Sequence, residues 1–476
     1  MRKGVPLLLV LVILTTSFVI TAKPVSAATP TADSWASKAP MNVARSSLGV
    51  AAVNGKIYAI GGTTESGFAP SAYGSWVYGY TANGVGTNEE YDPETNTWTY
   101  KASMPTPRLA FATVVYKNKI YCIGGQANRS YTGINEVYDP TTDTWETKTP
   151  MPTPRNWVTA NVVNGKIYLM GGYTPYSSTL NEVYDPETDS WGTKTPSPEV
   201  PITDSSLASC VFDNKIFLFG GLSQNQDHIL NQIYDTETDT WSAGTYPPSS
   251  LGGGAAAATT GAFAPKRIYA IGPAPVYEPG APLYTNRVYY PRTDSWWAAT
   301  DMPTKRFNFG IAVVNDTFYV VGGHTYSFPG SYAPVALNEQ YVPISYGTPD
   351  PSYVPPDITP PEIAVLSPEN RSYYMVDVAL NFTVSEPVSS MRYTLDGENL
   401  GEISGNTTLT GLPYGSHNLT VYATDAADNT GVSETIHFTI AEETKPFPTI
   451  LVAAASVATA VVVGVGLLVY FKKRKH

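Results

Sequence analysis

One segment recurs along residues 31–345, and it limits the possible folds more than any other feature. In its clearest copy, Lys166–Gly172 reads as a strand ending in a glycine pair, and Asn181–Trp191 as a strand, a tight turn and a strand opened by tryptophan. Glycine permits positive φ and close backbone approach, while proline and aspartate favour the turn. Because one unit cannot bury its own Tyr and Trp rings, the units must stack on one another.

The copies share three landmarks. Glycine pairs, one of them degenerate, lie at Gly61-Gly62, Gly124-Gly125, Gly171-Gly172, Gly220-Gly221, Gly272-Pro273 and Gly322-Gly323. Turn tyrosines lie at Tyr91, Tyr138, Tyr184, Tyr234 and Tyr289, followed by Trp98, Trp145, Trp191, Trp241 and Trp296. The spacing is near the about 50 residues of one four-stranded propeller blade. These motifs resemble kelch repeats; a solenoid of the same units is the alternative.

The sixth copy lacks one landmark. It has Gly322-Gly323 and the run Asn338–Tyr341, but no tryptophan follows. The missing piece occurs near the other end of the chain, in Thr31–Trp35. We therefore predict that residues 31–38 form the outermost strand of the last blade and close a six-bladed propeller over residues 28–345.

Both ends of the chain carry apolar segments. Residues 1–27 are typical of a secretory signal peptide, with a retained N-terminal anchor as the alternative. Residues 449–471 form an uncharged apolar run long enough to cross a bilayer of ~30 Å as one transmembrane helix. The basic residues 472–476 follow directly, which predicts a cytosolic tail. The expected protein is a single-pass type I cell-membrane protein whose propeller is extracellular.

Charge and cysteine content exclude some functions. The formal net charge is −11, and it falls to −18 without the seven basic residues of the two terminal segments. This acidity argues against binding nucleic acid or an acidic membrane surface. The two cysteines, Cys122 and Cys210, are too few for a disulfide framework, so we expect buried thiols.

A second module follows the repeats. Residues 346–361 read as a stiff proline-rich linker, and residues 362–441 show strand-like alternation separated by turn residues. This module resembles immunoglobulin-like or fibronectin-like β-sandwiches of microbial surface proteins, and the resemblance implies a spacer. Asp425 and Asp428 could hold calcium, or could serve the backbone of their turn. The expected fold class is thus all-β, with a propeller, a β-sandwich and one C-terminal transmembrane helix.

Six Asn-x-Ser/Thr sequons are candidate glycosylation sites if the chain is secreted. They lie at Asn128, Asn315, Asn370, Asn381, Asn406 and Asn418.

The loops after the glycine pairs vary most in length and are rich in aromatic residues. Among them we predict Tyr173, His324 and Tyr326 as ligand-binding residues, because variable loops on a rigid scaffold commonly bind ligands. Self-packing of these loops is the alternative.

Arginines recur at one position of the repeat. Arg45, Arg108, Arg155 and Arg306 each precede a glycine pair by sixteen residues, and Asp204 takes this place in the fourth copy. If these side chains rimmed one mouth of the propeller, they would attract carboxylates or phosphates. Arginine is also part of the ordinary kelch pattern, where it bonds the loop backbone, so both interpretations stay open.

No catalytic or metal-binding motif stands out, and we expect no cofactor. A copper oxidase resembling galactose oxidase needs two histidines and a Tyr/Cys pair, whereas His228 and His324 lie in separate copies. The sequence therefore favours recognition of, or adhesion to, an extracellular protein or glycan. An extracellular carbohydrate-active enzyme, mutarotase-like or oxidase-like, is the second hypothesis.

Overall fold

The protein is all-β in the part of residues 31–443 that the structure describes. The computed structural model describes residues 31–66, 82–198 without 175, 207–248 without 221, 224–225 and 228–229, 251–273 without 252, 284–327, 331–443 without 356, and residue 467. The predicted signal peptide, transmembrane segment and cytosolic tail, and Asp204, lie outside the described residues apart from Leu467. Among the described residues we find no helix with the length and apolar character to cross a membrane. The chain divides into two compact units, Met1–Tyr353 and Val354–His476.

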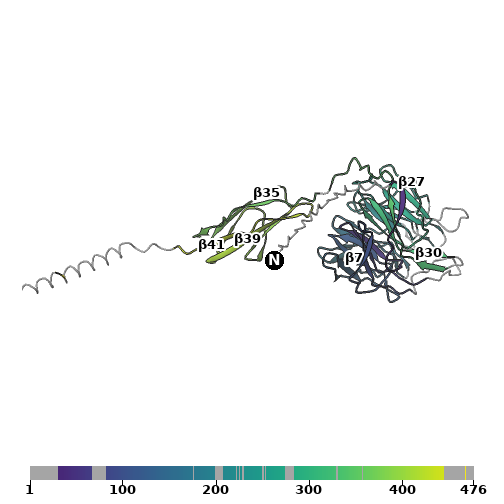
Figure 1. The fold of residues 1–476 in the computed structure, drawn as a ribbon, viewed down its shortest axis with the longest axis horizontal. Coiled ribbons are helices and arrows are strands. Elements are labelled where there is room, and N and C mark those ends of the chain that lie inside the picture. Colours follow the sequence, from purple (N-terminus) through teal and green to yellow (C-terminus); the bar gives the residue numbers. More distant parts are fainter. Residues whose placement is uncertain are drawn as a thin grey trace, which may run out of the picture. The chain divides into compact units, whose positions relative to one another are not determined.

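The described residues of the first unit contain six four-stranded antiparallel sheets (Figure 1). The first three are β2 (Gly49–Val53), β3 (Lys56–Ile60), β4 (Asn88–Asp92) and β5 (Thr97–Lys101); β6 (Ala112–Tyr116), β7 (Lys119–Ile123), β10 (Asn135–Asp139) and β11 (Thr144–Lys148); and β12 (Thr159–Val163), β13 (Lys166–Met170), β16 (Asn181–Asp185) and β17 (Ser190–Thr193). The others are β18 (Ala208–Phe212), β19 (Lys215–Phe219), β22 (Asn231–Asp235) and β23 (Thr240–Ala243); β24 (Ala255–Ala258), β25 (Ile268–Pro273), β26 (Tyr284–Tyr290) and β27 (Ser295–Ala299); and β28 (Gly310–Val314), β29 (Thr317–Val321), β32 (Asn338–Val342) and β1 (Ser34–Lys38).

The sheets pack side by side in a closed ring. The first strand of each sheet contacts the first strands of both neighbours, and contacts of β28 with β24 and β2 complete the circle. The second strands are buried along most of their length, as in the pattern of Lys166–Met170, where only the first residue is partly exposed. Strands covered on both faces read as continuous apolar runs, and this explains why the segment before each glycine pair is apolar.

A repeated polar clamp joins each sheet to the next. In the second sheet, Tyr138 donates a 2.6 Å hydrogen bond to Asp143, and the same carboxylate oxygen accepts from the backbone N–H of Ala102 in the first sheet. The indole N–H of Trp145 donates to the carbonyl of Ala102. The side-chain amide of Asn88 in the first sheet, the counterpart of Asn135 in the second, donates to the same carbonyl. Aspartate or asparagine and tryptophan thus hold both backbone groups of one residue in the preceding sheet.

The same clamp occurs at all six junctions. The residues held are Ala39, Ala102, Thr149, Thr195, Thr245 and Thr300, and the clamping pairs, in the same order, are Asn96/Trp98, Asp143/Trp145, Asp189/Trp191, Asp239/Trp241, Asp294/Trp296 and Asp33/Trp35. The recurring Asn, Tyr, Asp and Trp of the sequence repeat are therefore parts of one inter-sheet contact.

The N-terminal strand supplies the sixth clamp. Strand β1 pairs with β32 so that Trp35 lies opposite Tyr341, and the two rings are 5.0 Å apart between centroids. Tyr341 donates a 2.7 Å hydrogen bond to Asp33, while Asp33 and Trp35 hold the backbone of Thr300. Segments about 300 residues apart thereby build one sheet.

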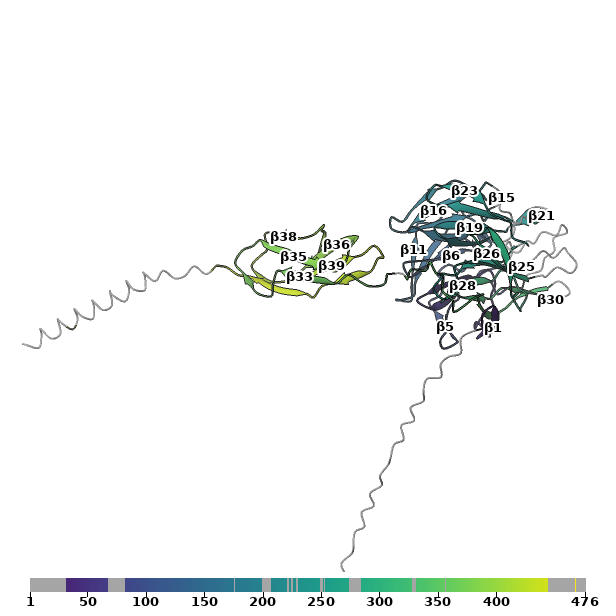
Figure 2. The same ribbon diagram turned by 90° about the horizontal axis from the view of Figure 1, so that it is seen from above.

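The two faces of the ring differ in their loops. On one face, the first two strands of five sheets are joined by two-residue turns, such as Asn54-Gly55, with both residues at positive φ. On the other face, short hairpins follow the glycine pairs of four sheets: β8 (Gln126–Ala127) with β9 (Ser130–Tyr131), β14 (Tyr173–Thr174) with β15 (Tyr176–Ser177), β20 (Leu222–Ser223) with β21 (Gln226–Asp227), and β30 (His324–Ser327) with β31 (Ser331–Pro334). We call these four hairpins the crown. Figure 2 shows β15, β21 and β30 on the same side of the propeller.

The segment predicted as a linker is partly docked on the first unit. Gly347 N–H donates to the carbonyl of Phe263, and Asp350 N–H donates to the carbonyl of Gly261, at 2.7 and 2.8 Å. The ring of Tyr346 stacks on Phe263. Residues 346–353 therefore belong to the first unit, because their backbone groups find partners there, and the division between the units falls after Tyr353.

The second unit has two β-sheets that share one core. One sheet holds β33 (Ile363–Ser367), β35 (Val378–Val384) and β38 (Thr407–Leu409); the other holds β34 (Ser372–Tyr373), β36 (Ser390–Leu395), β37 (Glu398–Glu402), β39 (Gly415–Thr424), β40 (Thr430–Val432) and β41 (Ile436–Ile440). The core joins Leu380 and Phe382 of the first sheet to Leu419, Val421 and Phe438 of the second. Alternating burial along β35 and β39 matches the alternating sequence of these strands.

A buried histidine predicts pH-dependent stability of this unit. His417 contacts the carboxylate of Asp396 through Nδ1 (2.7 Å) and the carbonyl of Pro413 through Nε2 (2.9 Å). Burial by itself lowers the pKa of His417, but these two acceptors outweigh it and raise the pKa above 6.5. The resulting stabilisation is fully present below pH 6.5 and is lost as pH rises through the folded-state pKa.

We therefore expect the midpoint of chemical unfolding of the second unit, followed by a reporter in that unit, to fall as pH rises from 6 to 9. The variant His417→Gln should flatten this dependence, because it removes the titrating group. An equally steep fall in His417→Gln would contradict the assignment.

Candidate recognition face

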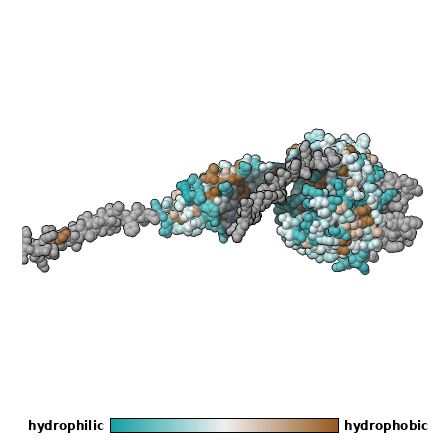
Figure 3. All heavy atoms as spheres, viewed as in Figure 1, coloured by the Kyte–Doolittle hydropathy of each residue, from teal (hydrophilic) through white to brown (hydrophobic). Residues whose placement is uncertain are grey.

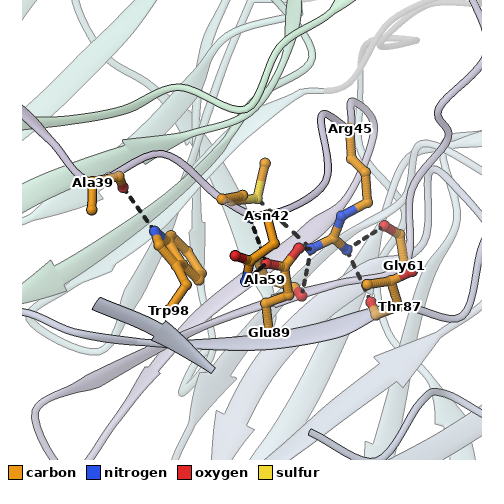
Figure 4. A network of polar contacts seen from close by, with 9 residues as sticks. Ala39, Asn42, Arg45, Ala59, Gly61, Thr87, Glu89 and Trp98 are labelled. Atoms are coloured by element: carbon orange, nitrogen blue, oxygen red, sulfur yellow. Dashed lines mark hydrogen bonds and ion pairs between the residues drawn. The ribbon is translucent and has the colours of Figure 1, made fainter. Parts of the chain in front are cut away.

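The repeated arginines lie inside the sheets. The side chain of Arg45 is fully buried. Its guanidinium donates to Glu89 at 2.9 Å and to the carbonyls of Gly61 and Thr87 at 2.8 and 2.9 Å, as Figure 4 shows. The same carboxylate accepts hydrogen bonds from the backbone and the side chain of Asn42. Arg45 therefore ties the segment before β2 to the glycine pair and to β4.

The other three arginines repeat this arrangement. Each is fully buried and forms an ion pair with a buried glutamate: Arg108 with Glu136, Arg155 with Glu182, and Arg306 with Glu339. Each also donates to backbone carbonyls near its glycine pair. Burial lowers the pKa of Arg45, Arg155 and Arg306, while the paired glutamate opposes that shift.

The glutamate is present only in the copies that carry the arginine. In the fourth copy, where Asp204 replaces arginine, the glutamate position is Gln232, which accepts a hydrogen bond from Ser197. In the fifth copy this position is Arg287. The four arginines therefore do not form a rim of ligand-binding guanidinium groups. Their spacing identified equivalent positions, but the side chains point into the sheets, where each guanidinium is paired with a glutamate.

The crown carries two of the predicted aromatic residues, Tyr173 and Tyr326, on separate hairpins. Tyr173 in β14 is half-buried, and its ring lies 5.8 Å from that of Tyr131 in β9, edge to face. This contact joins the hairpins of the second and third sheets. Tyr326 lies opposite Tyr332 in the register of β30 and β31. The crown is thus a continuous feature across at least two sheets, built on strands that the arginine–glutamate pairs fix.

His324 is the first residue of β30, at the base of the crown, where it lies in a wall between two sheets. It is 3% exposed, and its Nε2 is 3.0 Å from the hydroxyl of Ser46, which belongs to the next sheet around the ring. Its ring stacks on Phe307. Burial lowers the pKa of His324 to about 4, so the imidazole is neutral at physiological pH. His324 therefore supports the junction of the last and first sheets rather than presenting a charge to solvent.

Further polar residues of this wall were missed by the sequence analysis. The residue after each arginine pairs with the residue after its glycine pair, as Ser46 does with Thr63 and Asn156 with Tyr173. Thr63, Gln126 and Asn156 are as deeply buried as His324. The sequence could have located these residues only by their position. They directly follow the recurring arginine and the recurring glycine pair, but their identities vary between copies.

The residues two positions after each arginine take part in a chain of backbone hydrogen bonds, which we call the belt. The N–H of Ala110 donates to the carbonyl of Ser47, and the N–H of Trp157 donates to the carbonyl of Ala110. Ser47 donates in turn to Asn308, and Asn308 donates to Gly253. All five residues have positive φ, although only one is glycine. The belt thereby links neighbouring sheets to one another around the ring, on the face that bears the crown.

The described residues offer one group of three acidic side chains that could hold a cation, in the second unit. Oxygen atoms of Asp357, Glu386 and Asp425 lie within 4.8 Å of one another. The carboxylate of Asp425 accepts hydrogen bonds from the backbone of Ala427 and Asn429 and from the side chain of Asn429. These bonds account for Asp425 as a turn former, one of the two roles open for it.

The remaining candidates are placed as follows. Both cysteines are free and buried, and burial raises the pKa of the Cys122 thiol to about 12, which makes it unreactive. Of the sequon asparagines, Asn381 is half-buried, whereas five are exposed: Asn128, Asn315, Asn370, Asn406 and Asn418.

Comparison with known protein families agrees with the ring of sheets. A model described as the KLHDC2/KLHL20/DRC7 Kelch-repeats domain matches residues 144–323, and the Kelch motif matches residues 44–105 and 107–152. The chain is 32% identical over 96 residues to an F-box/kelch-repeat protein of Arabidopsis thaliana, covering 20% of this chain and 22% of that protein.

It is also 32% identical over 102 residues to human Kelch-like protein 28, covering 21% and 16% of the two chains. The chain thus spans less than a quarter of the length of either relative. The solved structure titled "Structure of YjhT" aligns with 63% of this chain and 95% of its own at 16% identity, with a TM-score of 0.48. From the matched repeats and the sheets that they form, we conclude that the first unit is a kelch-repeat β-propeller.

Proposed function

We propose that the chain is a cell-surface recognition or adhesion protein, and that its six-bladed kelch propeller binds an extracellular protein or glycan through the crown. Kelch repeats generally mediate binding to proteins. The observation that carries the proposal is the difference between the two faces. On one face, five of the six sheets have two-residue turns between their first two strands, whereas the other face bears four hairpins on a rigid ring. Binding residues commonly lie on loops that a rigid scaffold positions.

The ligand chemistry follows from the side chains available. The crown offers tyrosines, and the arginines beneath it are already paired with glutamate. Tyrosine combines a flat apolar face with a hydroxyl and loses little conformational entropy on binding, so it suits sugar rings and extended peptides. We therefore expect recognition by stacking and hydrogen bonding rather than by charge pairing.

The surface location is supported by sequence. Residues 1–27 have the features of a secretory signal, residues 449–471 those of a transmembrane segment, and residues 472–476 are basic. In this proposal the propeller and an immunoglobulin-like second unit are extracellular, and the exposed sequons are available for glycosylation.

Replacing crown tyrosines tests the binding role. We expect Tyr131→Ala and Tyr173→Ala each to weaken binding of a ligand, found on a glycan or peptide array, by about tenfold or more, as expected for the loss of an aromatic anchor. Their melting temperatures should stay within about 2 °C of the parent, because both residues lie outside the sheet cores.

Tyr100→Ala is the matched control, since Tyr100 is 59% exposed on β5, the outermost strand of a sheet that contributes no hairpin to the crown. It should bind like the parent protein. Equal binding by all three variants, with the fold retained, would remove the crown from the binding site.

A further inference from the structure

A cluster of exposed apolar side chains lies at one end of the second unit. Tyr374, Met375 and Tyr414 are 64%, 66% and 60% exposed, and Val376 is 40% exposed. The N–H of Leu412 donates to the carbonyl of Val376 at 2.9 Å, so the loop that leads to Tyr414 lies against the loop that carries Tyr374–Val376. We call these four residues the apolar tip. Figure 3 shows apolar residues, in brown, on the surface of this unit.

The chain leaves the second unit beside this tip. Strand β41 ends at Ile440, which pairs with Tyr373, and the next N–H, that of Ala441, donates to the carbonyl of Tyr373 at 2.8 Å. Tyr373 directly precedes the tip in sequence. The end of the last strand and the apolar tip therefore lie at the same end of the unit.

The distance along the chain to the proposed transmembrane segment is short. Seven residues, Glu442–Pro448, separate Ala441 from Thr449. Even a fully extended tether of this length spans only about 25 Å. A bilayer has interfacial layers of about 6 Å on each side of its hydrocarbon core, where tyrosine is enriched. The tether thus keeps the apolar tip within reach of the bilayer surface from which the proposed transmembrane segment enters.

We propose that the apolar tip contacts the lipid bilayer itself, with Tyr374, Met375 and Tyr414 inserted into the interfacial layer. This inference rests on the proposed membrane anchor. Tyrosine suits this layer, because its apolar ring enters the lipid while its hydroxyl stays hydrated, and methionine adds a flexible apolar side chain. The neighbouring Glu442 and Glu443 are acidic, so the contact depends on apolar burial and not on anionic lipid. The contact would orient the second unit on the membrane instead of leaving it free on its tether.

The test uses the full-length protein in vesicles of zwitterionic phosphatidylcholine. Single cysteines replace Tyr374, Ala426 or Ala458, and each is labelled with a polarity-sensitive fluorophore. Ala426 is exposed in the turn after β39, at the opposite end of the unit. The two native cysteines are buried, so the parent protein gives the labelling background. We expect Tyr374→Cys to show blue-shifted emission and at least twofold quenching by a quencher carried in the lipid headgroup region, unchanged by salt.

The outcomes separate the contact from the anchor. Ala426→Cys should report water, and Ala458→Cys, within the apolar run, should report hydrocarbon. Water-like emission from Tyr374→Cys together with a hydrocarbon signal from Ala458→Cys would overturn the contact and leave the anchor intact. Water-like emission from Ala458→Cys would overturn the anchor, and the contact with it.

Discussion

Deletion of residues 31–38 is expected to lower the melting temperature of the propeller by roughly 10 °C or more, because the loss of several kcal/mol shifts a domain of this size by that amount. The deletion removes strand β1 and its pairing along all five residues with β32. Among the described residues, Asp33 and Trp35 form the only clamp on Thr300, and the deletion removes both of them. The sixth sheet would then expose an unpaired edge, and Tyr341 would lose both its ring contact and its hydrogen bond.

Two point variants isolate the tryptophan. Trp35→Ala should cost about 3 kcal/mol, the usual scale for removing a packed aromatic ring, and lower the melting temperature by several degrees. Trp297→Ala is the matched control, because Trp297 is 63% exposed and follows the clamping residue Trp296. It should melt like the parent protein. Differential scanning calorimetry of the chain without its proposed signal peptide and transmembrane segment compares the parent with the deletion and the two point variants. An unchanged melt after the deletion would show that the ring does not depend on its N-terminal strand.

The sequence predicted the kelch propeller because the fold repeats its contacts. Each clamp needs an Asn, a Tyr, an Asp or Asn and a Trp at fixed positions, so five or six copies of one contact appear as five or six copies of one motif. The incomplete sixth copy indicated residues 31–38 in the same way, and in the structure Trp35 lies opposite Tyr341. Repeated local chemistry of this kind can be read without coordinates.

The candidate site was less predictable, because spacing fixes a position but not the direction of a side chain. Equal spacing of Arg45, Arg108, Arg155 and Arg306 was consistent both with a rim and with a buried strut. The deciding partner, a glutamate in the third strand of each of the four sheets that carry the arginine, lies 27 to 44 residues away in sequence. His324 showed the same difficulty: it follows a glycine pair, yet it is buried against Ser46 of another sheet. Docking of residues 346–353 was missed because proline-rich composition says nothing about the backbone acceptors that Gly261 and Phe263 provide.

The arginine–glutamate pairs give the second large prediction, and it separates a structural role from a ligand role. Arg155 and Glu182 are both buried, and the arginine also donates to the carbonyls of Gly171 and Leu169. Arg155→Met would leave the Glu182 carboxylate buried without its counter-charge. Loss of one partner of a buried pair typically costs about 3–5 kcal/mol. We therefore expect a fall in melting temperature of about 6–20 °C, on the scale of about 2–4 °C per kcal/mol for large domains.

The double variant Arg155→Met/Glu182→Gln makes this prediction specific. It removes both charges and should recover part of the lost stability, because no ion remains buried alone; the fourth sheet, with Gln232 in place of the glutamate, shows that the fold accepts a neutral side chain there. A coupling energy of about 1–3 kcal/mol from the double-mutant cycle would establish the pair as a structural unit. If Arg155→Met instead kept the parent's melting temperature and lost ligand binding, the guanidinium would belong to the binding site, and the pairing seen here would have to open for the ligand.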